Sequence, residues 1–276
     1  MPLRIVCLHG MNQQQYNAAS LQDYWYTLLQ ARLQQYIPNL NCNKFEFCVP
    51  FYADLITQHH LANQFNVGTF SPKLVPHWHL PLPLNHFKAT PIWQHWHALG
   101  RDLAIKELLQ VLDFFPKLDT ELMQHFLIEA YLYLCDAEFI QQVHQRVAAA
   151  LNPNQPTLVI AHSLGSVIAY NLLRQHPEYR IHTLITLASP LAFKIIQAKI
   201  IHPIQRPACI LGDWLNFYSK NDFLSAFPLS KAPFSFQPSI KNQVIRTDLA
   251  NPHQLQQYLQ HPLVLSELAK ILIAWA

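Results

Sequence analysis

Short apolar runs recur along the chain, and each is too short to form a helix. The first, Leu3–Leu8, consists mostly of residues that favour strands. Runs of the same kind predict five further strands, over residues 45–49, 158–161, 181–187, 214–218 and 243–246. Because several of these runs are apolar at almost every position, they indicate a parallel sheet that is buried on both faces.

Stretches with helical periodicity separate several of these runs. Residues 21–37 repeat apolar side chains every three or four positions until Pro38 ends the pattern. A second helix is predicted over 167–173, shortly after the 158–161 strand, and a third from about 252 to 275. Strands that alternate with helices predict the α/β fold class, with a mostly parallel sheet flanked by helices.

The regular alternation breaks between residue 54 and about residue 136. Five prolines forbid a regular helix or a central strand over 71–91, and two helical patterns follow, over roughly 93–115 and 119–135. An irregular stretch of this length inside a domain is often a functional lid. We therefore predict a core of residues 1–54 and 137–276, interrupted by a lid or cap insertion over 55–136.

The composition favours a folded protein without nucleic-acid partners. Hydrophobic residues make up 51% of the chain and charged residues 13%, which argues against a disordered chain. The formal net charge of +3 is small for 276 residues, and Lys and Arg form no run. We therefore expect no nucleic-acid binding.

The cysteines and the N-terminal sequence indicate a soluble, cytoplasmic protein. The five cysteines are odd in number and lie among apolar residues, which is typical of reduced, buried thiols. "MPLRIVCLHG" lacks the long apolar core of a signal peptide. No stretch approaches the ~18 apolar residues of a membrane span, so we expect no transmembrane segment and a C-terminal "LAKILIAWA" that packs on the sheet. The cysteines are Cys7, Cys42, Cys48, Cys135 and Cys209.

The stretch "VIAHSLGSVIAY" places Ser163 between a predicted strand and a predicted helix. A sharp turn from strand to helix strains the serine backbone and exposes its hydroxyl above the sheet. Small residues two positions before and after the serine let the strand and the helix pass closely, as in the nucleophile elbow G-x-S-x-G. Here they are Ala161 and Gly165, and alanine at the first position departs from that pattern. Ser163 is therefore the candidate nucleophile.

A nucleophilic serine needs a base and an orienting acid. Asp222 lies in the loop after the 214–218 strand, and His253 lies between the last strand and the last helix. The order serine, acid, histidine is the one used by α/β hydrolases. Since carboxyl ends of parallel strands share one edge, we expect Ser163, Asp222 and His253 to meet there.

Other residues compete for these roles. Asp248 also follows a strand and is the alternative acid, and His261 is the alternative base. Asp213 precedes its strand, so it should lie at the opposite edge of the sheet. His162 adjoins the serine and should point away from it, as a packing residue.

Two backbone N–H groups are candidates for an oxyanion hole, which holds the charge that develops on a carbonyl oxygen. Leu164 follows the nucleophile directly, and Met11 lies in the loop after the first strand. Gly10 permits a tight turn in that loop. His9 either shapes this turn or is a buried histidine of the core.

A group of histidines in the insertion raises the possibility of a metal site. No cysteine or acidic residue stands at ligand spacing over 71–97, so we expect side chains that line a cleft and no bound metal. Aromatic residues of the same segment are expected to be mostly core, and we hypothesise that some line an acyl-binding pocket. The histidines are His77, His79, His86, His95 and His97, and the aromatic residues are Trp78, Phe87, Trp93 and Trp96.

Together these motifs resemble the α/β-hydrolase superfamily, in particular small bacterial serine esterases and lipase-like proteins. The resemblance covers residues 1–54 and 137–276 and rests on "LHGMN", "VPFYADL", "VIAHSLGSVIAY", "LITLASPL", "WLNFYSKND" and H-x-x-x-x-Y-L. It implies hydrolysis of esters, amides or thioesters through an acyl-enzyme, without a cofactor. "FYSKND" stands where relatives are expected to carry "YDxxD", and Asp222 keeps the second acid.

The expected function is therefore that of a serine hydrolase that cleaves a small-molecule carboxylic ester. The same three residues would also serve an acyltransferase or a thioesterase. A non-catalytic binding protein on the same fold is a further alternative, because fold alone does not determine function.

Overall fold

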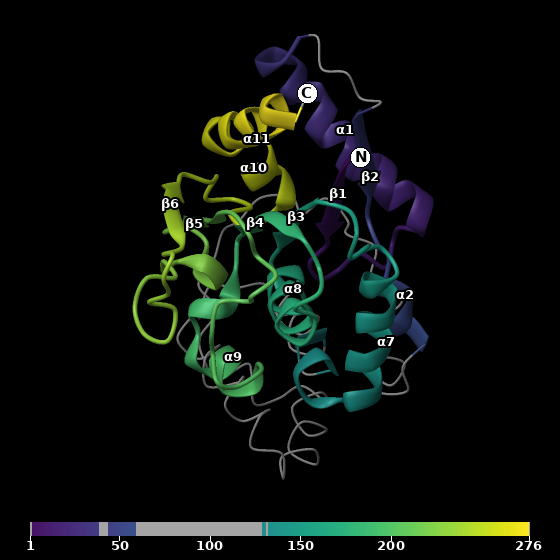
Figure 1. The fold of residues 1–276 in the computed structure, drawn as a ribbon, viewed down its shortest axis with the longest axis vertical. Helices are drawn as coiled ribbons and strands as arrows, with labels where there is room; N and C mark the ends of the chain where they lie inside the picture. Colours follow the sequence, from purple (N-terminus) through teal and green to yellow (C-terminus); the bar gives the residue numbers. More distant parts are fainter. Residues whose placement is uncertain (1, 39–43, 59–128, 131, 276) are drawn as a thin grey trace.

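The computed structural model describes residues 2–38, 44–58, 129–130 and 132–275 (Figure 1). Within them a six-stranded sheet has the order β2-β1-β3-β4-β5-β6, and every neighbouring pair is parallel. The strands are β1 Leu3–Leu8, β2 Phe45–Cys48, β3 Thr157–His162, β4 Ile181–Leu187, β5 Trp214–Ser219 and β6 Lys241–Ile245. The predicted parallel sheet is confirmed.

The strand order reverses at the centre of the sheet. The chain steps from β1 to β2 on one side and then returns to place β3 on the other side of β1. In open α/β sheets such a switch point opens a crevice at the carboxyl ends of the strands, where ligands bind. The loop after β1 and the turn after β3 both lie at this point.

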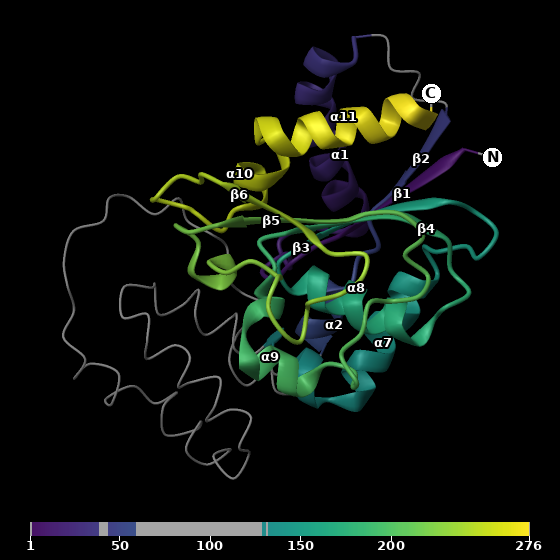
Figure 2. The ribbon, with the colours of Figure 1, turned by 60° about the vertical axis from the view of Figure 1, so that its left-hand side comes forward.

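Helices cover both faces of the sheet, as Figure 2 shows. One layer contains α1 Ala18–Tyr36, α10 Leu255–Leu259 and α11 Pro262–Trp275. The other contains α2 Ala53–Gln58, α7 Ala137–Ala148, α8 Leu164–Gln175 and α9 Lys194–Lys199. Two short 3-10 helices, η4 Pro190–Ala192 and η5 Phe223–Ser225, follow β4 and β5.

The alternation of side chains along each strand divides the core in two. In β1, Ile5 and Cys7 face the layer of α1 and α11, whereas Val6 and Leu8 face α7 and α8. Both sets are buried, which explains why the strand is apolar at nearly every position. Trp25 of α1 is fully buried in the first of these cores.

Several helices differ from the sequence-based prediction. The single helix predicted from about 252 to 275 is two helices, because Pro262 has no N–H to continue the ladder and His261 Nδ1 accepts a hydrogen bond from Leu263 N–H. The helix α7 was not predicted; Asp136 caps its N-terminus, and the side chain of Asp136 accepts a hydrogen bond from Phe139 N–H. The short helices α2 and α9 were not predicted either.

Most of the predicted lid lies outside the described residues, and its role stays a prediction. The described residues at its two ends pack into the core, since Leu55, Ile56 and Leu132 are all buried in the cluster that α7 and α8 cover. Over the described ranges, none of the helices has both the length and the apolar character that a membrane crossing requires. The four cysteines in these ranges form no disulfide.

Candidate active site

Backbone strain gathers at the carboxyl edge of three adjacent strands. Asn12, Ser163 and Ala188 have φ angles of 58°, 53° and 52°, in the left-handed region that non-glycine residues seldom occupy. They lie in the turns after β1, β3 and β4, which are neighbours in the sheet. A residue in such a conformation costs about 1–3 kcal/mol, and these conformations cluster at functional sites. The strain therefore points to this edge of the sheet as the candidate site.

Ser163 forms the turn between β3 and α8, as the elbow pattern predicts. Its N–H donates to the Leu187 carbonyl at 2.9 Å. Its carbonyl accepts from the N–H of Ser166 at 2.9 Å and from the Ser166 hydroxyl at 2.6 Å. Hydrogen bonds on both sides of the residue therefore hold the strained conformation in place.

Two glycines allow this turn to approach β1. A Cβ atom at position 165 would lie 2.5 Å from the carbonyl oxygens of both Leu8 and His9. A Cβ atom at position 10 would lie 2.8 Å from Ser163 Cβ. Neither glycine has a positive φ, so lack of space, and not left-handed backbone, explains glycine at Gly10 and Gly165.

The structure brings Ser163, His253 and Asp222 together. His253 Nε2 lies 2.7 Å from Ser163 Oγ, and His253 Nδ1 lies 2.8 Å from Asp222 Oδ2. Since a carboxylate only accepts hydrogen bonds, Nδ1 carries the ring proton and Nε2 is left to accept from the serine hydroxyl. The Asp222 side chain is 0% exposed and that of His253 is 19% exposed, so only the histidine reaches solvent.

The local structure fixes the acid. Asp222 follows β5 and caps η5, where its Oδ1 accepts from Leu224 N–H at 3.1 Å. Burial favours the neutral carboxyl, but the His253 ring and the hydroxyls of Tyr258 and Ser225 outweigh it and hold the pKa of Asp222 below its usual value. The carboxylate is therefore ionised and can orient the imidazole.

The competing residues have other partners. Asp248 is exposed and its Oδ1 accepts from Ala250 N–H at 3.0 Å. Asp213 lies at the amino end of β5, as expected, and pairs with Lys241 at 2.7 Å. His261 accepts from the first turn of α11.

The turn after β1 is held by His9. Tyr52 N–H donates to His9 Nε2 at 3.3 Å, so Nδ1 carries the proton and donates to the Gly10 carbonyl at 2.8 Å. The rings of His9 and Tyr52 stack with their centroids 3.6 Å apart, and the Tyr52 hydroxyl donates to the His9 carbonyl. Burial lowers the pKa of His9 to about 4. The neutral ring is both a core residue and a support of the turn.

The hydrogen bond from His9 to the Gly10 carbonyl also determines the direction of the Met11 N–H. The Gly10 carbonyl and the Met11 N–H belong to one trans peptide and point in opposite directions. A hydrogen bond to the carbonyl therefore also fixes the N–H. Leu164 is the first residue of α8, so its N–H has no partner within the helix.

Sequence reasoning missed a buried carboxyl behind this turn. Glu129 Oε1 accepts from Asn12 N–H at 2.9 Å and from Gln14 Nε2 at 2.7 Å. Burial raises the pKa of Glu129 to about 7, against the effect of these two donors. Gln13 Nε2 donates to the Met11 carbonyl at 2.8 Å, so side chains hold both sides of the turn.

His162 does more than the packing that was expected of it. Its ring centroid lies 5.2 Å from that of His253, and its Nε2 donates to the His253 carbonyl at 3.1 Å. Burial, followed by repulsion from His253, lowers the pKa of His162 to about 3. A neutral imidazole therefore holds the backbone of His253 in position.

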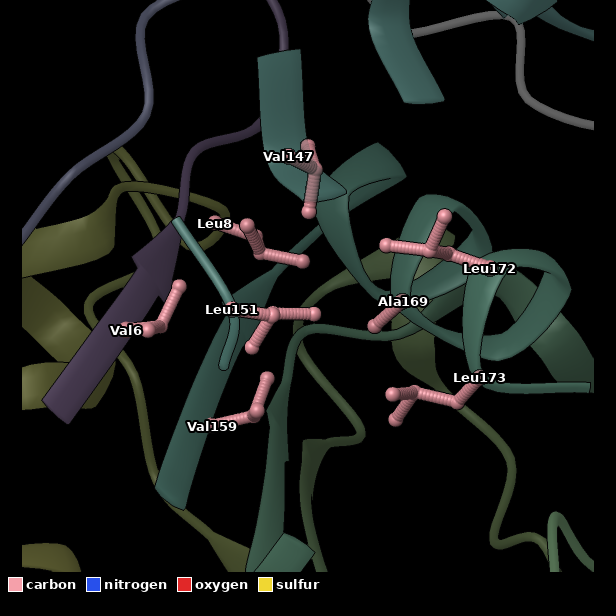
Figure 3. A pocket seen from close by; sticks show the side chains of 8 residues that line it. All are labelled: Val6, Leu8, Val147, Leu151, Val159, Ala169, Leu172 and Leu173. Carbon is pink, nitrogen blue, oxygen red and sulfur yellow. The ribbon is translucent and has the colours of Figure 1, made fainter. Parts of the chain in front are cut away.

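A small apolar cavity lies elsewhere in the molecule, between the sheet and the α7–α8 layer (Figure 3). Val6, Leu8, Val159 and Leu172 are among the side chains that line it, and none of the candidate site residues is among them. It is a packing gap in the core and not a substrate pocket.

No metal site is found among the described residues, where no three His, Cys, Asp or Glu side chains form a cluster that could hold an ion. The insertion histidines at 77, 79, 86, 95 and 97 and the aromatic residues proposed to line a pocket lie outside those ranges.

The sequence matches no known protein family model, and no similar curated protein was found. The motifs and the geometry of the site therefore carry the functional argument.

Proposed function

We propose that the chain is a serine hydrolase of the α/β-hydrolase superfamily that cleaves carboxylic esters through an acyl-enzyme. The observation that carries the proposal is the continuous chain of hydrogen bonds from Asp222 through His253 to Ser163. It joins turns that follow three different strands at one edge of the sheet, which is the arrangement that a nucleophile, a base and an orienting acid require.

Acylation begins when His253 Nε2 takes the proton of the Ser163 hydroxyl. Oγ attacks the ester carbonyl carbon, and the carbonyl oxygen becomes an oxyanion. His253 then gives its proton to the departing alcohol oxygen, and the acyl group remains on Ser163. In the second half, His253 deprotonates a water molecule, whose oxygen attacks the acyl carbon. The bond from that carbon to Ser163 Oγ then breaks, His253 returns its proton to Oγ, and the acid is released.

Asp222 serves this cycle without being protonated. It keeps the ring proton on Nδ1, so that Nε2 faces the serine, and its charge stabilises the imidazolium that forms in each half. Its complete burial strengthens that interaction, because water does not screen it.

The N–H groups of Met11 and Leu164 are proposed to bind the oxyanion. Gly10 packs against Ser163 and His9 fixes the peptide that leads into Met11, which supports the first donor. The free N-terminus of α8 supports the second. In a comparable hydrolase the removal of one such donor costs about 3 kcal/mol of transition-state stabilisation.

A fluorophosphonate probe tests the nucleophile. The wild type is expected to be labelled, and Ser163→Ala is expected to show neither labelling nor hydrolysis of a panel of acyl esters of increasing chain length. Ser20→Ala, which changes a partly exposed serine of α1, is the control and should label normally. Labelling of Ser163→Ala would refute the assignment, and a folded wild type that is never labelled would indicate a binding protein.

Added alcohols and thioesters define the reaction further. Hydrolysis predicts free acid as the main product when a simple alcohol is present. A dominant ester product would identify an acyltransferase, and a strong preference for thioesters over matched oxygen esters would identify a thioesterase.

A further inference from the structure

Tyr258 contacts the same carboxylate oxygen of the acid that the base contacts. It lies in α10, which begins just after His253, and it is fully buried. Its hydroxyl donates to Asp222 Oδ2 at 2.6 Å. The same carboxylate oxygen accepts from His253 Nδ1 at 2.8 Å, so one atom joins the tyrosine to the base.

Ser225 completes a closed group of three oxygens. Its hydroxyl lies 3.0 Å from Asp222 Oδ2 and 2.7 Å from the Tyr258 hydroxyl. Ser225 and Asp222 are both buried, at 1% and 0% exposure. The carboxylate is therefore fixed in one orientation, with Oδ2 directed at His253.

This group also links the two loops that carry the acid and the base. Asp222 and Ser225 belong to the segment after β5, whereas Tyr258 belongs to the helix that follows the His253 loop. The Tyr258–Asp222 hydrogen bond therefore holds the two loops against each other.

Hydroxyl donors change the chemistry of a carboxylate as well as its position. Each donated hydrogen bond withdraws negative charge from the oxygen and lowers its affinity for a proton. Since Asp222 shares its charge with the His253 ring, such donors also weaken the hold of the pair on the proton that His253 takes from serine.

We propose that Tyr258 is a positioning residue that orients the His253–Asp222 pair and lowers its proton affinity during the ester hydrolysis proposed above, on which this inference rests.

None of the other titratable groups that the structure describes around the His253–Asp222 pair duplicates the effect of the Tyr258 hydroxyl on the carboxylate. Among the described residues, His162 faces His253 from β3, His9 follows β1 and acts electrostatically on His162, and Tyr258 faces Asp222 from α10. Burial lowers the pKa of His162 and of His9 to about 3 and about 4, so both rings are neutral when the enzyme works. Neither supplies a positive charge that could replace the hydroxyl.

Tyr258→Phe tests the proposal, because it removes the hydroxyl and keeps the ring. The acid limb of the profile of kcat/KM against pH is expected to move to higher pH by about 0.5 to 1 pH unit. We expect kcat/KM at pH 7 to fall about threefold to tenfold per active site, counted by fluorophosphonate labelling.

Tyr170→Phe is the matched control. Tyr170 is also fully buried, and its hydroxyl donates to the Gln205 carbonyl at 3.1 Å, away from the pair. This variant is expected to keep the acid limb of the wild type. If Tyr258→Phe merely has fewer active molecules and an unchanged acid limb, Tyr258 is only structural and the proposal is wrong.

Two further measurements keep the test decisive. Should Tyr258→Phe not fold, Ser225→Ala opens the same group of oxygens, and its acid limb must also move to higher pH.

Titration of the His253 ring by NMR in Ser163→Ala, with and without Tyr258→Phe, needs no activity. A higher titration midpoint without the hydroxyl supports the inference even if no ester is cleaved, whereas an unchanged midpoint overturns it. Absent probe labelling of the wild type overturns only the hydrolase assignment.

Discussion

Gly165 lies where the end of β1 meets the start of α8, and space there is limited by backbone atoms. A methyl group would meet two carbonyl oxygens at 2.5 Å, which no side-chain rotation can relieve. We expect Gly165→Ala to lower the free energy of unfolding by about 1–3 kcal/mol and to abolish probe labelling, because the turn must open. Denaturation in urea and fluorophosphonate labelling measure the two effects.

Gly10→Ala provides the comparison for this variant. Its methyl group would press on side-chain atoms of Ser163 and His162, at 2.8 Å and 3.1 Å, so the loss of stability should be smaller while labelling is still slowed. Wild-type stability and labelling in Gly165→Ala would show that the close approach of α8 to β1 is not required.

Glu129 makes the stability of the protein depend on pH. Burial raises its pKa from 4.5 to about 7, so the folded state holds this proton more tightly than the unfolded chain. Its contribution to stability is therefore complete at low pH and is lost as the pH rises from about 4.5 to about 7. Glu129→Gln keeps an acceptor for Asn12 and Gln14 and cannot ionise.

Relative to the wild type, Glu129→Gln should therefore gain about 1–3 kcal/mol of stability between pH 5 and pH 8. Urea denaturation at the two pH values measures the difference. If the free energy of unfolding changes equally in both proteins between these pH values, Glu129 does not titrate in this range.

At the scale of the element, α1 begins with a capping box. Asn17 Oδ1 accepts from Ser20 N–H, and Ser20 Oγ accepts from Asn17 N–H, each at 2.9 Å. Asn17→Ala should lower the free energy of unfolding by about 1 kcal/mol and leave ester hydrolysis per active site unchanged, because this helix end is exposed. A loss of hydrolysis at wild-type stability would contradict this separation.

The elements show where a sequence pattern is informative. The strands were predictable because parallel strands buried on both faces are continuously apolar, and β1 and β4 occur at the predicted residues. The break between α10 and α11 was missed, since apolar periodicity continues across Pro262. The start of α7 was missed because Asp136 follows helical residues without an intervening loop.

At the scale of the whole molecule, the candidate site was predictable as far as topology determines it. Ser163, Asp222 and His253 each follow a strand, and parallel strands place their carboxyl ends together. The contacts of Glu129 and Tyr258 depend instead on side-chain packing. Asn12 and Glu129 are 117 positions apart, and no local pattern indicates that they meet.

The order of the strands has a consequence for the synthesis of the protein. A nascent chain contains Ser163 long before it contains His253, which follows the edge strand β6. Under the proposed mechanism, the emerging serine is inert until that last strand has joined the sheet. A partly folded chain that lacks β6 in the sheet would therefore be unreactive, and activity would report that this strand is in place.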